Sequence, residues 1–207
     1  MAPVTKLDHT KSELFLFVDK FEKLIEDTAN LLGIWQILGP PANEASKLFC
    51  GLVPDICLIG ERFLITQDPS LDDQDRFGVY MAHFPAGASV QSLVHYAQIM
   101  NAKSFRLFDW GQKKNVEKYG QGTPPDIDLT KITKVPTAMF VGTEDDLGDT
   151  TDCHWARDQI QKGGDALVHY QEVEAGHSTF MIGKDMSYFD DVRDLIHTYN
   201  PISQKFL

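Results

Sequence analysis

Residues 135–149, VPTAMFVGTEDDLGD, join a short apolar run to a loop rich in carboxylates. The run 135–142 has the length of a buried strand, and Gly142 ends it. A helix is expected over 152–161, a second strand over 166–173 (ALVHYQEV), and a closing helix over 185–199. Because strand, helix, strand and helix in this order are typical of a parallel sheet covered by helices, the sequence predicts an α/β fold.

Each predicted strand is followed by a titratable side chain. Asp145 follows the first strand, and His177 follows the second in the stretch EAGHSTF. The carboxyl ends of parallel strands are where ligands and catalytic groups gather in open α/β sheets. A carboxylate can hold an imidazole through its Nδ1–H and leave Nε2 as a general base. Asp145 and His177 are therefore candidate catalytic residues, although the residues alone leave Asp146 open as the acid.

The same residues also fit simpler interpretations. A cluster of aspartates after a strand is often a solvated turn, and a histidine after a glycine is often a surface side chain. The carboxylates at 144–146, 149 and 152 miss the spacing and the glycine of a calcium-binding EF-hand. We therefore expect neither a metal site nor a cofactor.

The region 12–105 has a mainly helical pattern. An amphipathic helix that begins at Ser12 is expected to bury Leu14, Phe17, Val18, Phe21, Leu24 and Ile25 on one face. Further helices are expected from Asn43 to Val53 and from Ser89 to Met100, and another apolar stretch spans 56–65. The aspartate-rich run 68–75 is predicted to be a solvated loop, and 111–134 a long connecting loop.

Composition narrows the class of protein. The chain has 207 residues and a formal net charge of −11, which fits one medium domain and disfavours nucleic-acid binding. No apolar run approaches the ~20 residues that a transmembrane helix needs. The N-terminus lacks the pattern of a secretory signal peptide. Three cysteines (Cys50, Cys57 and Cys153) are too few for a disulfide scaffold, so buried free thiols are expected.

Short motifs across the chain point to a known family. They are Ala2-Pro3-Val4, HFPAGASVQ at 83–91, FDWG at 108–111, Pro124-Pro125, Val135-Pro136, 142–149, and Gly176-His177 with Phe180 following. In this order the sequence resembles the acid lipases, which include gastric lipase and lysosomal acid lipase. The resemblance implies triacylglycerol or steryl ester substrates, cleaved by acyl transfer to serine and then to water, in a lysosomal or secreted setting. It implies Asp145 as the catalytic acid, by its spacing from Gly142, and His177 as the base.

The resemblance also implies a division of the chain. Residues 1–10 would be a strand of the hydrolase core, 11–105 a helical cap or lid that covers the active site and contacts the acyl chain, and 106–207 the C-terminal part of the core. The family's nucleophile sits in a Gly-x-Ser-x-Gly elbow before the Ala-Pro-Val strand. None of the nine serines lies in such an elbow, and Ser89, in Gly87-Ala88-Ser89-Val90-Gln91, is expected to begin a helix instead.

The sequence thus predicts the C-terminal portion of an α/β-hydrolase fold with a mainly helical cap, in which the N-terminal sheet half and the nucleophile elbow are absent. It would be part of a lipase-like carboxylic ester hydrolase of lipid catabolism and would carry the catalytic acid and base but no nucleophile. We therefore expect the chain by itself to be inactive. Alternatives are a non-catalytic binding or assembly module with an apolar groove, and one half of a split enzyme. The expected partners are a lipid ester or acyl chain, and either the missing half or another protein chain.

Overall fold

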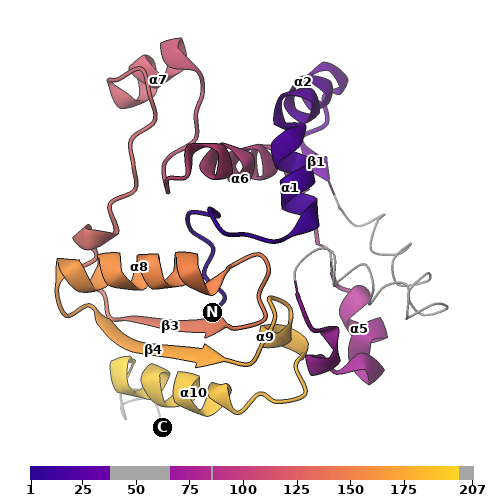
Figure 1. Ribbon diagram of the computed structural model, residues 1–207, viewed down its shortest axis with the longest axis vertical. Helices are drawn as coiled ribbons and strands as arrows, with labels where there is room; N and C mark the ends of the chain where they lie inside the picture. The colour runs from indigo at the N-terminus through magenta and orange to yellow at the C-terminus, as the bar shows by residue number, and fades with distance from the viewer. Residues whose placement is uncertain (38–65, 85, 201–207) are drawn as a thin grey trace, which may run out of the picture.

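The computed structural model describes residues 1–37, 66–84 and 86–200. Its C-terminal part contains β3 (Thr137–Gly142), α8 (Thr150–Gly163), β4 (Leu167–Val173), α9 (Thr179–Ile182) and α10 (Tyr188–Tyr199). Strands β3 and β4 are parallel, with Thr137 opposite Leu167 and Gly142 opposite Val173. Helix α8 lies on one side of the strands and α10 on the other (Figure 1). The α/β arrangement predicted for this part is confirmed.

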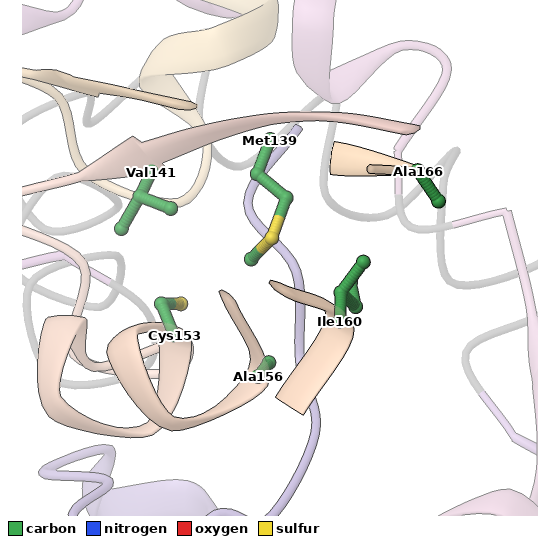
Figure 2. Close-up of a cluster of buried hydrophobic side chains, with 6 residues drawn as sticks. All are labelled: Met139, Val141, Cys153, Ala156, Ile160 and Ala166. Atoms are coloured by element: carbon green, nitrogen blue, oxygen red, sulfur yellow. The ribbon is translucent and has the colours of Figure 1, made fainter. Parts of the chain in front are cut away.

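Alternate side chains of β3 point to the two helical layers. Met139 and Val141 meet Cys153, Ala156 and Ile160 of α8 in a buried cluster that also includes Ala166 (Figure 2). Phe140 faces the opposite way and packs with Ala175, Phe180 and Tyr188. Since each fully buried apolar side chain contributes about 1.5–3 kcal/mol, these two clusters fix the strands and therefore the place where they end.

The remaining elements are mainly helical. They are α1 (Glu13–Lys20), α2 (Glu22–Leu32), β1 (Gln36–Ile37), η1 (Pro69–Leu71), η2 (Gln74–Arg76), α5 (Phe77–Met81), β2 (Ala88–Ser89), α6 (Val90–Ala102), α7 (Gln112–Tyr119) and η3 (Leu129–Lys131). Strand β1 pairs antiparallel with β2, and α1 and α2 pack against α6. None of the helices in the described ranges is long and apolar enough to cross a membrane. The predictions for 43–53 and 56–65, and those for Cys50 and Cys57, lie outside the described residues.

The first predicted helix is two helices. Ser12 takes the N-cap position as expected, but at Phe21 the backbone (φ −116°, ψ 17°) leaves the helical region. The apolar periodicity does not run continuously across this break. In α1 Phe15 and Val18 are buried, while Phe17, and Leu24 in α2, both expected in the core, are 56% and 63% exposed.

Both loop predictions need correction. The segment 111–134 contains α7, which ends at Gly120 in the left-handed conformation (φ 74°), and then η3. Helix α7 buries only Asn115, so it has no apolar stripe that would reveal it. The run 68–75 is exposed at residues 68, 70, 74 and 75, as predicted for a solvated loop, but it contains η1 and the start of η2, and its Asp72 is fully buried.

Residues 1–10 do not form the expected strand, although they begin beside β3. The amide of Ala2 donates to the carbonyl of Phe140 (2.9 Å). Ala2 has a positive φ (46°), and Pro3 has no amide hydrogen, so the chain leaves the ladder at once. Helix α6 begins at Val90 with Ser89 as its N-cap, which accepts from the Gln91 amide (3.1 Å); this prediction is confirmed.

Candidate active site

The two parallel strands end so close together that the loops after them touch. A Cβ atom on Gly142 would lie 2.2 Å from the carbonyl oxygen of Ala175, so only glycine fits at the end of β3. Beyond it, the amide of Thr143 donates to the carbonyl of Val173 (2.9 Å) and the amide of Glu144 to that of Ala175 (3.1 Å). The chain segments that carry Asp145 and His177 are thereby joined through their backbones.

Asp145 and His177 form a hydrogen-bonded pair. Nδ1 of His177 lies 2.9 Å from Oδ2 of Asp145. The side chain of Asp145 is fully buried, and that of His177 is 26% exposed. Oδ1 of Asp145 accepts from the amides of Leu147 (2.9 Å) and Gly148 (2.7 Å), which fixes the plane of the carboxyl group. With Nδ1 engaged in this way, Nε2 is the ring nitrogen left for exchanging a proton.

Asp146, the other candidate acid, has a different environment. Its side chain is half-buried, and burial raises the pKa of its carboxyl group above the usual value, while a hydrogen bond from Gln67 acts in the opposite direction. Its backbone carbonyl accepts from the amide of Lys11 (2.8 Å) and the hydroxyl of Thr10 (2.8 Å). Of the two neighbouring carboxylates, the structure brings Asp145 to His177.

The remaining carboxylates of this loop hold α8 and the N-terminal segment. Asp149 caps α8 by accepting from the amide of Thr151 (2.8 Å) and pairs with Lys11 (3.3 Å). Burial works to raise the pKa of Asp149, but its hydrogen bonds to Thr151 and Lys11 together lower it. Asp152 pairs with His9 (2.9 Å). In the described ranges no group of three or more histidine, cysteine, aspartate or glutamate side chains is arranged to hold a metal ion.

Sequence reasoning missed a set of buried polar residues next to this pair. Thr66, Asp72 and Ser178 are all fully buried, and the hydroxyl of Ser178 donates to Oδ2 of Asp72 (3.3 Å). These contacts connect the helical region to the loop that carries His177, and Asp72 and Ser178 are 106 positions apart in sequence. No local pattern marks such a contact, because periodicity reports only on neighbours along one element.

Comparison with known proteins finds lipases. No protein-family model matches the chain. It is 33% identical over 159 residues to lipase lipl-5 of Caenorhabditis elegans (73% of this chain, 39% of the relative). It is 36% identical over 111 residues to gastric triacylglycerol lipase of Rattus norvegicus (53% and 27%).

A third relative covers nearly all of the chain. It is the putative lysosomal acid lipase/cholesteryl ester hydrolase of Crotalus adamanteus, 33% identical over 210 residues, or 95% of this chain and 49% of the relative. The chain therefore spans less than half the length of each of these curated relatives.

Proposed function

Because the chain is a member of the acid lipase family that matches less than half of its relatives' length, we propose that it acts within a lipase-like carboxylic ester hydrolase of lipid catabolism. Asp145 and His177 are its catalytic acid and base, and the nucleophilic serine comes from outside these 207 residues. The observation that carries this proposal is the 2.9 Å contact between His177 Nδ1 and Asp145 Oδ2 at the joined ends of two parallel strands.

The geometry suits one catalytic step in particular. A serine hydroxyl at Nε2 of His177 would lose its proton to the imidazole as it attacks the ester carbonyl. Asp145, which accepts hydrogen bonds at both oxygens, would stabilise the resulting imidazolium through Nδ1–H. The same proton then passes to the leaving alcohol, and a water molecule releases the acyl group by the reverse sequence.

The substrate class and the division of the chain are part of the proposal. Triacylglycerols or steryl esters are the substrates, because the relatives include a gastric triacylglycerol lipase and a putative cholesteryl ester hydrolase. Residues 1–10 and 106–207 belong to the C-terminal portion of the hydrolase core, and 11–105 form the lid. The helical character of α1, α2 and α6 supports this division.

Reconstitution of the enzyme tests the proposal. The purified chain alone is expected to leave p-nitrophenyl butyrate unhydrolysed, because it lacks a Gly-x-Ser-x-Gly elbow. Mixed with or fused to the elbow-bearing part of a relative, such as the rat gastric lipase, it should hydrolyse the ester and bind a fluorophosphonate probe at the elbow serine. His177→Ala should lower the rate by about 10²- to 10⁴-fold.

Two results would overturn the proposal. One is ester turnover by the isolated chain that His177→Ala abolishes. The other is a reconstituted enzyme whose rate His177→Ala leaves unchanged. A folded assembly that binds no probe and hydrolyses no ester would instead favour the non-catalytic binding module.

A further inference from the structure

A single segment of the helical region contacts both loops that carry the candidate pair. We call residues 66–73 (TQDPSLDD) the strap. At its start, Thr66 forms an antiparallel bridge with Asp145, and the amide of Gln67 donates to the carbonyl of Glu144 (2.9 Å). The hydroxyl of Thr66 also reaches the carbonyl of Glu144 (3.5 Å). The strap thus fixes the backbone of the acid and of the residue before it.

The strap also contacts both sequence neighbours of His177. Thr66 fills the space beside Gly176 so closely that a Cβ atom there would lie 1.7 Å from its Oγ1. On the other side of the histidine, the hydroxyl of Ser178 donates to Oδ2 of Asp72 (3.3 Å). Thr66, Asp72 and Ser178 are all fully buried, so water does not compete for these contacts.

Further backbone contacts continue past the histidine. Asp72 bridges to Gly183, and the amide of Asp73 donates to the carbonyl of Ile182 (2.7 Å). The amide of Lys184 donates in turn to the carbonyl of Leu71 (2.9 Å). The strap therefore contacts the segment after His177 as far as Lys184, in addition to residues 176 and 178.

We propose that the strap positions His177 against Asp145, and that Thr66 and Asp72 are positioning residues for the catalytic pair. The strap fixes the backbone on both sides of His177, and it also fixes the backbone of Asp145. Because one segment sets both ends of the Nδ1–Oδ2 contact, the orientation of the histidine depends on the helical region and not on the sheet alone. The inference rests on the proposed function for the catalytic meaning of that orientation.

Ring nitrogen spectra of the full chain test this role directly. In the intact protein at about pH 8, a long-range proton–nitrogen NMR spectrum should report His177 mainly as its Nδ1–H tautomer, with the signal identified by its loss in His177→Gln. Ser178→Ala and Thr66→Ala should convert it to a mixture of both tautomers. Amide exchange over 176–183 should quicken by about tenfold, because a buried hydrogen bond or contact is lost.

Two controls separate positioning from general damage. Thr66→Val keeps a branched side chain against Gly176 and should retain the tautomer seen in the unmodified chain. Ser104→Ala removes an exposed serine–aspartate hydrogen bond, to Asp126, and should leave His177 unchanged. If Ser178→Ala fails to fold, the comparison of Thr66→Ala with Thr66→Val decides alone.

The inference is wrong if the folded Ser178→Ala and Thr66→Ala chains keep the tautomer and exchange rates of the unmodified protein. These measurements need no ester hydrolysis, so the two proposals fail separately. If the tautomer of His177 depends on the strap but His177→Ala leaves the rate of ester hydrolysis unchanged, only the proposed function is refuted. If the reconstituted enzyme is active but the tautomer of His177 does not depend on the strap, only this inference is refuted.

Discussion

Two glycines permit the contact between Asp145 and His177. Gly142 ends β3 where a Cβ atom would meet the carbonyl of Ala175, and Gly176 precedes His177 where a Cβ atom would meet Thr66. Both are needed for space, because the neighbouring atoms lie well within van der Waals distance of the missing Cβ. The contact between Asp145 and His177 therefore also depends on two residues that have no side chain.

Gly176→Ala should destabilise the fold. The added methyl group has to displace Thr66, and such overpacking costs about 1–3 kcal/mol. Urea unfolding followed by circular dichroism measures the loss, and Thr66→Gly in the same chain should restore part of it. Gly122→Ala is the matched control, because its Cβ would meet the flexible side chain of Gln112 at 3.3 Å. Equal stability of Gly176→Ala and Gly122→Ala would contradict the close contact.

Cys153 should make stability depend on pH in the alkaline range. Burial, together with the nearby charges of Asp145 and Asp152, raises the pKa of its thiol from 9.0 to about 12. The unfolded chain therefore releases this proton near pH 9.0, while the folded chain keeps it until about pH 12. The contribution of the neutral thiol to stability is complete below pH 9.0 and is lost as the pH rises through this window.

Denaturant titrations at several pH values compare the protein with Cys153→Ala. The free energy of unfolding of the unmodified chain should fall more steeply above pH 9.0, by up to about 1.4 kcal/mol more per pH unit. Identical slopes for the two chains would show that the thiol is not buried as described.

At the scale of elements, α7 and the loop before it are organised by one buried amide. The side chain of Asn115 donates to Oδ1 of Asp109 (2.7 Å) and to the carbonyl of Gly122 (3.1 Å), and its oxygen accepts from the amide of Trp110 (2.9 Å). Lys118 lies over the Trp110 ring, 4.4 Å from its centre. Polar contacts thus replace the apolar packing that α7 lacks.

Asn115→Ala should release α7 without unfolding the sheet. The variant loses three part-buried hydrogen bonds, at a local cost of about 0.5–1.5 kcal/mol for each. Hydrogen exchange measured by mass spectrometry should quicken over 109–123 and stay slow in β3. Lys114→Ala, on the same helix, serves as the control. Unchanged exchange in the Asn115→Ala chain would contradict this organisation of α7.

The same elements show how far the sequence could be interpreted. The elements β3, α8, β4 and α10 were predictable because each has an apolar pattern that repeats along it, and the parallel pairing follows from their order. The meeting of Asp145 with His177 was predictable too, since both follow parallel strands. Helix α7 was not, because its single buried residue is polar.

The strap was not predictable for a different reason. Four aspartates between 68 and 75 suggest a solvated loop, yet Asp72 is buried by contacts with residues 178 and 183. A carboxyl group so far from its partner in sequence has no local signature. Tertiary contacts, not composition, decide which aspartate of such a run is buried.

In the whole molecule, the parallel sheet is small. In the part of the chain that the structure describes, the parallel sheet has two strands, and such sheets are ordinarily larger and covered on both faces. Large apolar side chains of α2 and of the residues just before β1 are also exposed, with Leu31 at 84%. Open strand edges and exposed apolar surface both favour association.

We expect the isolated chain to associate in solution. Size-exclusion chromatography with light scattering should give a mass above 23.3 kDa that increases with protein concentration. The elbow-bearing part of a relative should suppress this self-association by covering the sheet edge. A monodisperse monomer with a cooperative thermal transition would contradict the expectation.

The proposed roles of Asp145 as the acid and His177 as the base of an acid lipase are tested by one matched pair of variants. In the reconstituted enzyme, kcat/KM for trioleoylglycerol is measured for Asp145→Asn and for its neighbour Asp146→Asn. Asp145→Asn should lose about 10²- to 10⁴-fold, because the amide no longer stabilises the imidazolium, while Asp146→Asn should stay near the unmodified rate. Equal rates for the two variants, or a larger loss for Asp146→Asn, would show that Asp145 is not the catalytic acid.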